Sequence, residues 1–276
     1  MPELPEVETI KKDLLRWVVG CSITGISLPW SQVVRKPSAG EFRRKLVGRT
    51  IKEVRRRGKY LLLPLNVETL ILHLKMAGFL SLKPSSKPEP YTSAVFHLDN
   101  NRHLYFCDRR RLGAMWLVKD EKEVVGKLGP EPLEPEFTPQ LLGKLLSQHS
   151  IPIKALLCDQ NIIAGIGNMY ADEALFEARI HPLKRAKGLS KEEVERLHQA
   201  IHQVLTTAIG YGGASVDTYK RPDGQLGTAH YFFQVAHRGG ETCYNCHTPI
   251  ERLPLRGRGT YFCPNCQRES EQLALI

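Results

Sequence analysis

Four cysteines near the C-terminal end constrain the fold of this chain more than any other feature. They are Cys243, Cys246, Cys263 and Cys266. Two residues separate the members of each pair, and sixteen residues separate the two pairs. Paired thiolates at this spacing fit one tetrahedral zinc ion in a zinc ribbon, with His237 and His247 as weaker rival ligands. A module with so little apolar core needs its metal to fold.

The other cysteines favour a reducing compartment. The chain has seven cysteines, and the remaining three, Cys21, Cys107 and Cys158, are scattered. An odd number with a single cluster suits one metal site better than a set of disulfides. Acidic residues near the N-terminus exclude a signal peptide, and the most apolar stretch, 60–74, is too interrupted to span a bilayer. We therefore expect a soluble cytoplasmic protein with no membrane partner.

The charge balance indicates a polyanionic partner. Lysine and arginine number 39 against 29 acids, which gives a net charge of +10 over 276 residues. Charge alone does not distinguish nucleic acid from an acidic membrane. Nine of the basic residues lie between positions 43 and 59, with Glu53 as the single acid. A run of charged residues ordinarily lies on a solvated face, but nine basic residues against one acid favour a phosphate-binding role.

Hydrophobic periodicity divides the chain into three parts. Residues 5–19 have the pattern of a helix. Short strands follow, at 22–28, 50–57, 60–65, 69–74, 94–98, 103–106 and 114–118, and many short strands indicate a sandwich or barrel. A stretch with four prolines, within 129–139, is typical of a linker. Helices are then predicted at 140–148, 152–159, 168–178 and 190–209, the last with a capping box from Ser190 and Glu193.

These patterns predict an α+β chain of two domains, with an N-terminal β-sandwich flanked by helices and a helical C-terminal domain that carries the zinc ribbon. The expected boundaries are 1–131 for the sandwich, 132–138 for the linker, 139–235 for the helical domain, 236–270 for the zinc ribbon and 271–276 for a tail. No internal repeat is present.

The first residues suggest a nucleophile. Methionine before a small residue is usually removed, which would leave Pro2 as the N-terminal residue, with Glu3 beside it. An α-amine titrates near 8, so a usable fraction is unprotonated at neutral pH and can attack a sugar or carbonyl carbon. A secondary amine that adds to an aldehyde-level carbon yields a cationic iminium, and Glu3 could act as the general acid or base. Most prolines at position 2 do nothing, so this motif alone is weak evidence.

The opening Met-Pro-Glu-Leu-Pro-Glu-Val-Glu resembles that of the formamidopyrimidine-DNA glycosylases, bacterial enzymes that excise oxidised purines. Further blocks extend the resemblance over the whole chain. Residues 56–62 resemble the family's Arg-Arg-x-Lys-Tyr-Leu-Leu, residues 73–78 its His-Leu-x-Met-x-Gly, and residues 162–176 its helix–two-turn–helix motif. Residues 258–263 match Arg-x-Thr-aromatic-aromatic-Cys in the zinc ribbon.

The resemblance implies a bifunctional glycosylase and abasic-site lyase acting on oxidised bases in double-stranded DNA. Pro2 would be the nucleophile, Glu3 the proton-transfer residue, Lys59 an assisting lysine and Arg258 the phosphate-gripping arginine of the zinc ribbon. A monomer in the bacterial cytoplasm, at the nucleoid, is implied as well. Expected DNA contacts come from His73, Met76, Tyr91, Arg110, Leu112, Lys154 and Asn168.

Two of these positions depart from the family pattern. Leu112 stands where the family has a wedging phenylalanine, although leucine is still an accepted wedge residue. Tyr91 stands where many relatives have a DNA-contacting histidine. Two alternatives remain: an endonuclease VIII type of enzyme that prefers oxidised pyrimidines, and a zinc-ribbon protein that binds damage without cutting. Retained Met1 would favour the second, because it would block the amine.

Overall fold

The computed structural model describes residues 1–84 and 89–268. The predicted tail at 271–276 lies outside these residues. Spatial proximity divides the chain into two compact units. The first comprises Met1–Lys127 and Ile209–His230, and the second comprises Leu128–Ala208 and the chain from Tyr231 onward. The N-terminal unit therefore includes a segment from the second half of the chain. The finer boundaries expected from the sequence stay predictions.

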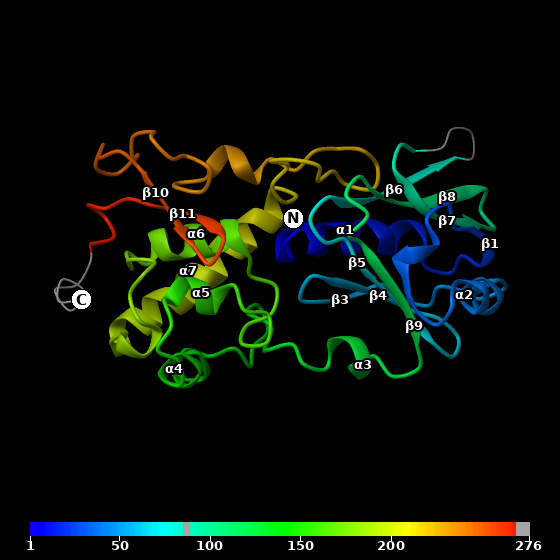
Figure 1. Cartoon of the computed structure of the whole chain (residues 1–276), viewed down its shortest axis with the longest axis horizontal. Coiled ribbons are helices and arrows are strands. Elements are labelled where there is room, and N and C mark those ends of the chain that lie inside the picture. The colour runs from blue at the N-terminus through cyan, green and yellow to red at the C-terminus, as the bar shows by residue number, and fades with distance from the viewer. Residues whose placement is uncertain (85–88, 269–276) are drawn as a thin grey trace. The chain divides into compact units, whose positions relative to one another are not determined.

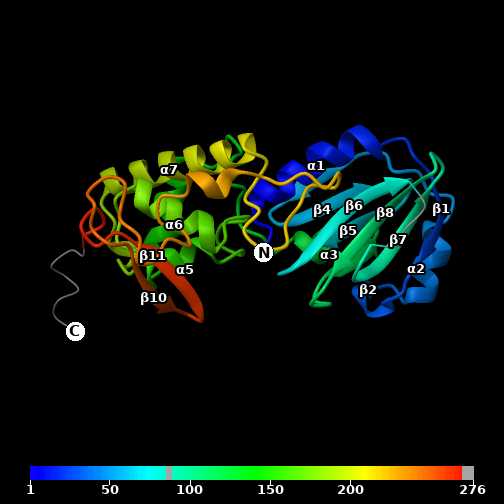
Figure 2. The ribbon, with the colours of Figure 1, turned by 90° about the horizontal axis from the view of Figure 1, so that it is seen from above.

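The N-terminal unit is built on two sheets, which are visible in Figure 2. One sheet has the order β1 (Ile23–Ser27), β7 (Thr92–Leu98), β8 (Arg102–Asp108) and β6 (Gly78–Pro84). The other has the order β2 (Val34–Lys36), β9 (Ala114–Val118), β5 (Thr69–His73), β4 (Tyr60–Pro64) and β3 (Arg55–Arg57). Neighbouring strands are antiparallel except β2 and β9. Leu61 and Leu63 of one sheet share a core with Phe96 and Phe106 of the other, so the predicted sheet domain is confirmed.

Helix α1 (Leu4–Trp17) packs on this core through Val7, Ile10 and Leu14, which are almost fully buried. A capping box begins the helix, because the Glu6 carboxylate accepts a hydrogen bond of 2.7 Å from the Glu3 backbone N–H. Two shorter helices, α2 (Ala39–Leu46) and α3 (Lys122–Val125), complete the unit. The predicted helix at 5–19 is thus confirmed within two residues at its ends.

The segment between 34 and 57 differs most from the expectation. Helix α2 and strand β2 were not expected, and strand structure in the predicted 50–57 is confined to Arg55–Arg57. Only two residues of α2, Phe42 and Leu46, are buried, so its apolar pattern is short, and the basic residues around them obscure it. Residues before Arg55 make only scattered backbone bonds, such as Lys52 N–H to Pro64 O.

The basic run at 43–59 does not form one surface. Arg43, Arg44 and Lys45 lie in α2, where Lys45 pairs with Glu41 and Glu68. Arg56 instead lies in β3 and is largely buried in an ion pair with Glu8. Part of the run therefore stabilises the fold.

The C-terminal unit is helical and ends in a small hairpin (Figure 1). Its helices are α4 (Pro139–Ser147), α5 (Ile153–Leu157), α6 (Asn168–Glu177) and α7 (Lys191–Gly210), whose last two residues belong to the N-terminal unit. Strands β10 (Glu251–Leu255) and β11 (Arg258–Phe262) form the antiparallel hairpin. The predicted capping box is confirmed, since Ser190 and Glu193 bond each other's backbone N–H. Across the described parts of the chain, every helix is too short or too polar to cross a membrane.

Candidate active site

One end of the sandwich gathers most of the predicted site residues of the N-terminal unit. In the sheets, Tyr60 is paired with His73, His73 with Ala114, and Gly78 with Asp108. These registers bring three turns to the same end: 58–59, 74–77 and 109–113. Lys59, Met76, Arg110 and Leu112 lie in these turns, and His73 is the residue at which β5 ends. Residues up to 53 positions apart in the chain, Lys59 and Leu112, are thereby placed along one edge.

Two loops form the core of this edge, because each passes from one sheet to the other. The 74–77 turn joins β5 to β6, and the 109–113 turn joins β8 to β9. Gly78 lacks the space for a side chain, since a Cβ atom there would lie 2.3 Å from the Leu74 carbonyl oxygen. The first loop is therefore tight, and it leaves the Met76 side chain 43% exposed.

Asp108 organises the second loop. Its carboxylate accepts hydrogen bonds from the backbone N–H groups of Arg110 at 2.9 Å, Leu112 at 2.7 Å and Gly113 at 2.6 Å. Asp108 itself is 1% exposed, so a buried carboxylate satisfies three amides that would otherwise lack partners. The loop is thereby held in one shape, with the Arg110 and Leu112 side chains exposed.

Tyr91 lies at the same end, just before β7. Its carbonyl oxygen accepts a hydrogen bond of 2.9 Å from the Asp108 backbone N–H, and its side chain is 60% exposed. Arg111 of the neighbouring loop lies over the Trp30 ring, 4.2 Å from its centroid, and this contact anchors the loop further. The exposed side chains of the edge therefore stand on well-fixed backbone.

Lys59 and His73 are buried behind these exposed groups. Lys59 follows Gly58 in a two-residue hairpin turn, and the φ of +55° at Gly58 suits glycine there. Lys59 is only 4% exposed. His73 packs edge-on against Tyr60, and burial together with the positive charges of Lys75 and Lys59 lowers its pKa to about 3. The His73 imidazole is therefore neutral near pH 7 and can donate only one hydrogen bond.

The start of α1 carries the proposed nucleophile. Pro2 and Glu3 are both buried, and Glu3 is 2% exposed. One turn later, Glu8 accepts a hydrogen bond of 2.9 Å from Arg56 Nε in β3. Burial alone would raise the pKa of Glu8, but Lys11 and Arg56 hold it below its usual value. This pair attaches the helix start to the strand that leads into the Lys59 turn.

The segment 214–228 is fastened to the same helix. The Glu6 carboxylate accepts a hydrogen bond of 2.8 Å from the Ala214 backbone N–H, and Asp13 binds Arg221 with two bonds of 2.8 and 2.6 Å. Tyr219 is buried in the core of the N-terminal unit. Gly213, with a φ of +79°, has no room for a side chain against Glu6. This segment is thus a well-anchored part of the N-terminal unit.

In the C-terminal unit, a glycine turn leads into α6. Gln160 holds the turn, because it accepts a bond of 2.9 Å from Gly165 N–H and donates one of 2.7 Å to Ile166 O. Asn168 is the first residue of α6 and donates a bond of 2.9 Å to the carbonyl oxygen of Gly259 in the hairpin. The N-terminus of a helix is suited to bind phosphate, because the helix dipole favours negative charge there.

Lys154 is buried in a network of polar contacts. It is 1% exposed and forms an ion pair of 2.7 Å with Asp172. Its amine also donates bonds of 3.0 Å to Gly259 O and 2.9 Å to Thr260 Oγ1. Asp172 in turn accepts a bond of 3.2 Å from the Tyr261 backbone N–H. Lys154 therefore joins helices α5 and α6 to strand β11, and its predicted contact with DNA stays a prediction.

The hairpin exposes its arginines. Arg256 and Gly257 form its two-residue turn with φ angles of 48° and 74°, as a tight primed turn requires. Arg258 follows directly as the first residue of β11, and its side chain is exposed. Arg258 therefore lies beside the tip of the hairpin.

The four cysteines form one cluster. Their sulfur atoms all lie within 4.8 Å of one another, with 3.9 Å between Cys243 and Cys266 and 3.4 Å between Cys246 and Cys263. A tetrahedral zinc ion with Zn–S bonds of about 2.3 Å separates its ligands by about 3.8 Å, so the cluster fits such an ion. His237 and His247 are outside this cluster, the only one of its kind among the described residues.

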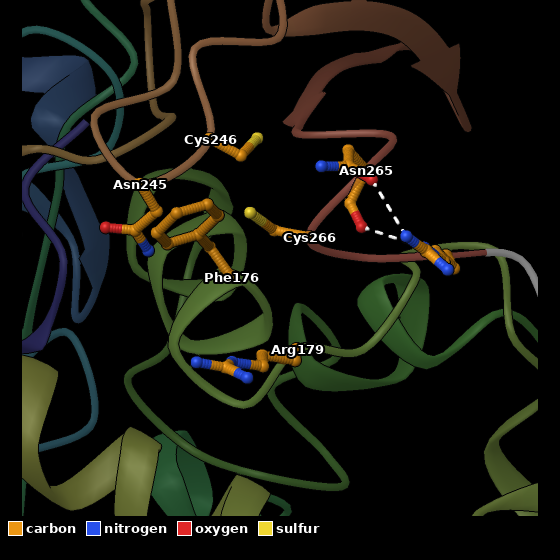
Figure 3. Close-up of a pocket in the computed structure, with 7 residues that line it drawn as sticks. Phe176, Arg179, Asn245, Cys246, Asn265 and Cys266 are labelled. Atoms are coloured by element: carbon orange, nitrogen blue, oxygen red, sulfur yellow. Dashed lines mark hydrogen bonds between the residues drawn. The ribbon is translucent and has the colours of Figure 1, made fainter.

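Apolar side chains and a pocket both adjoin the cluster. Phe176, Val235 and Ile250 pack against it. A pocket of about 580 Å³ opens beside it, where the sulfur atoms of Cys246 and Cys266 lie near the Phe176 ring and Asn265 (Figure 3). Hydrogen bonds from Thr248 lower the pKa of Cys246, whereas burial raises the pKa of Cys263 and Cys266.

Several residues that shape these sites were not identified from the sequence. Asp108 and Gln160 bind backbone groups, and Asp172 forms a buried ion pair. Glu173 accepts three hydrogen bonds from the backbone N–H groups of residues 234–236. An acid directly before a run of three arginines was a visible signal for Asp108. The other three leave no signal, because their partners are distant in the sequence or are backbone atoms.

Comparison with known proteins agrees with this architecture. Residues 1–115 match the model of the formamidopyrimidine-DNA glycosylase N-terminal domain, and residues 128–220 match that of its H2TH domain. The chain is 42% identical to a formamidopyrimidine-DNA glycosylase of Symbiobacterium thermophilum, over 100% of this chain and 92% of that protein. It is 43% identical to the protein of the same name from Chloroflexus aurantiacus, over 99% of each.

Two solved structures extend the comparison to the fold. The MutM (Fpg) protein of Thermus thermophilus matches with a TM-score of 0.89 and 40% identity, over 98% of this chain and 100% of that one. A Lactococcus lactis Fpg mutant in complex with DNA containing Fapy-dG matches with a TM-score of 0.91 and 33% identity, over 97% of this chain and 100% of that one. The chain therefore belongs to the formamidopyrimidine-DNA glycosylase family.

Proposed function

We propose that this protein is a bifunctional DNA glycosylase and abasic-site lyase that removes oxidised purines, including 8-oxoguanine and formamidopyrimidines, from double-stranded DNA in base excision repair. The names of its relatives and the Fapy-dG-containing DNA bound in a similar structure support this activity. Because those relatives are bacterial, we expect the protein to act at the nucleoid. We also expect it to be a monomer. An enzyme acting on a base must first unstack it from the duplex.

The chemistry begins at Pro2, once Met1 has been removed. The secondary amine attacks C1′ of the lesion nucleotide, the bond from C1′ to the base breaks, and the base leaves with its electron pair and takes up a proton. Glu3 protonates the sugar ring oxygen as the ring opens, which leaves an iminium between Pro2 and C1′. A buried carboxyl group next to the nucleophile is suited to such a proton transfer.

The iminium then drives strand cleavage. It makes the C2′ proton acidic, and loss of this proton expels the 3′ phosphate by β-elimination. A second elimination expels the 5′ phosphate, and water then releases the sugar fragment from Pro2. Lys59 assists these proton transfers. We assign this role because the Lys59 turn is attached, through the Arg56–Glu8 pair, to the helix that begins at Pro2 and Glu3.

The edge of the sandwich would hold the DNA. Exposed Met76 and Leu112 would fill the gap left by the extruded base, and Arg110 would read the unpaired opposite base. Neutral His73 would donate a hydrogen bond to phosphate, and Tyr91 would do the same from its exposed position. In the C-terminal unit, Asn168 and Arg258 would bind phosphates near the lesion, where Arg258 also aids the elimination.

The cysteine cluster would hold one structural zinc ion, with Cys243, Cys246, Cys263 and Cys266 as its ligands. The ion would supply a fixed tetrahedral centre for a module that has little apolar core of its own. This module carries β10 and β11, so its folding would keep Arg258 in position.

The observation that carries the proposal is the position of a buried Glu3 directly after Pro2 at the start of α1. Both residues belong to the unit whose edge gathers Lys59, Met76 and Leu112. The test compares wild type with Glu3→Gln in single-turnover excision of 8-oxoguanine from duplex DNA. We expect Glu3→Gln to abolish excision and to leave DNA binding largely intact, while Glu41→Gln, on α2, behaves like wild type. Undiminished excision by Glu3→Gln would contradict the proposal, and a preference for oxidised pyrimidines would favour the endonuclease VIII type.

A further inference from the structure

Two histidines on neighbouring strands form a pair that the proposed DNA chemistry does not use. His97 of β7 and His103 of β8 are directly opposite each other in the sheet. Their Nδ1 atoms are 2.9 Å apart, and their rings meet at 89° with centroids 4.4 Å apart. Both side chains are partly exposed, so an ion from solvent can reach them.

The two Nδ1 atoms share a hydrogen bond of 2.9 Å, and the same separation is also compatible with a particular coordination geometry. Two ligands at right angles around a metal, with bonds of 2.0–2.1 Å, are separated by about 2.9 Å. Two ligands of a tetrahedral ion at the same bond length are separated by about 3.4 Å. The pair is therefore suited to an ion with square-planar or tetragonal preference, which in proteins is Cu²⁺ or Ni²⁺.

The surroundings hold the rings in this arrangement. Ser27 Oγ lies 2.9 Å from His97 Nε2, and a hydrogen bond on the outer ring nitrogen leaves Nδ1 available for a ligand bond. Gly25 is opposite His97 on the other side, and a Cβ atom there would come within 3.3 Å of the His97 ring. Lys83, the neighbour of His103 on β6, directs its charge to Glu89.

We propose that His97 and His103 form a metal site, separate from the cysteine cluster, that binds a tetragonal divalent ion such as Cu²⁺ through both Nδ1 atoms. The shared proton leaves to solvent, and the ion binds beside the line between the two nitrogens, where a small rotation of each ring directs both Nδ1 lone pairs to it. Water or another small ligand occupies the remaining positions around the ion. Copper binds a given nitrogen site more tightly than the other divalent first-row metals, so Cu²⁺ is the probe of choice.

The test uses the zinc-loaded full chain with one equivalent of Cu²⁺, and measures electron paramagnetic resonance and bound copper after desalting. We expect a tetragonal Cu²⁺ signal with two equatorial nitrogens and about one copper per chain. His97→Gln and His103→Gln should each lose this signal. His202→Gln, which changes an exposed histidine of α7, is the matched control and should keep it. Circular dichroism verifies that each variant is folded.

A milder variant separates ligation from folding. Ser27→Ala removes only the group that orients His97, and loss of such a partner typically weakens metal binding by about 10- to 100-fold. Copper affinity, measured by competition with glycine, should fall within this range while the two-nitrogen signal persists. The proposal is overturned if the signal is unchanged in His97→Gln, or if copper binds only by displacing zinc from the cysteines.

Discussion

Lys154 Nζ lies 2.7 Å from Asp172 Oδ1, and both residues are 1% exposed. The pair connects two helices of the C-terminal unit to β11, because Lys154 also binds Gly259 and Thr260 while Asp172 binds the Tyr261 N–H. Burial raises the pKa of Asp172 to about 7 in spite of the neighbouring Lys154. Desolvation is therefore substantial at this site, and removal of either charge alone should be costly.

Lys154→Met should destabilise the C-terminal unit by about 3–5 kcal/mol, because it leaves a buried carboxylate without its cation. The double variant Lys154→Met/Asp172→Leu should recover most of this loss. The measurement is urea unfolding followed by circular dichroism, which reports mainly on helices α4–α7. DNA binding distinguishes two roles for Lys154. If the lysine positions the hairpin, the double variant should restore affinity, whereas persistent loss with a salt dependence lowered by about one phosphate contact would indicate direct contact with DNA.

Met76 and Leu112 should affect extrusion of the base more than later chemistry. Unstacking a base costs a few kcal/mol, and these two exposed side chains are the apolar candidates that fill the gap. Leucine covers less stacking area than phenylalanine, so Met76 is expected to fill more of the gap left by the extruded base. Leu112→Ala should slow excision from duplex DNA and barely change cleavage at a preformed abasic site, while Leu112→Phe is tolerated. Single-turnover rates for both substrates, with Met76→Ala in parallel, test this, and an equal loss in both assays would indicate a purely structural role.

His73 should make the stability of the N-terminal unit depend on pH. Burial lowers its pKa from 6.5 to about 3 in the folded chain, so the unfolded chain binds more protons between these values. Stability must then fall as the pH falls from about 6.5 toward 3. The loss attributable to His73 between pH 7 and pH 5 is about 2 kcal/mol.

Tryptophan fluorescence is a selective probe for this effect. The chain has three tryptophans, Trp17, Trp30 and Trp116, and all of them lie in the N-terminal unit. Urea unfolding at pH 7 and pH 5 should show a smaller difference for His73→Gln than for wild type, with His202→Gln as the control. The same pH difference in wild type and His73→Gln would contradict the assignment.

The zinc assignment makes a prediction about both units. Protein purified without chelator should contain one zinc ion per chain, and chelation should unfold the zinc ribbon because the module lacks a core of its own. DNA affinity should fall, while tryptophan fluorescence of the N-terminal unit stays unchanged. Absence of metal in the purified protein, or a full affinity after its removal, would refute the assignment.

The sequence predicted those parts of the fold whose patterns are local. The apolar face of α1, the capping box at Ser190 and the paired cysteines each depend on residues within a few positions of one another, and all three agree with the structure. Helix α2 was missed because only Phe42 and Leu46 mark its buried face, inside a strongly basic run. Strand β6 was missed because it is recognised by its hydrogen bonding to β8, and this pairing exists only in the folded chain.

The candidate site shows the same limit. Exposed residues such as Met76 and Arg258 were found because motif resemblance points to them directly. Lys154 was expected to contact DNA, and the burial that the structure shows for it involves Asp172, eighteen residues further along the chain. Asp108 was passed over since its role is to bind backbone amides, and such bonds place few demands on the sequence around them.

The central claim is that the amine of Pro2 attacks the sugar, and borohydride trapping tests it most directly. The enzyme is incubated with duplex DNA containing 8-oxoguanine and with sodium borohydride, and the covalent product is digested and mapped by mass spectrometry. Intact mass of the starting protein first establishes that Met1 is absent. The account predicts a single DNA adduct on the N-terminal Pro2. An adduct on Lys59, or none at all while the base is still excised, would contradict it.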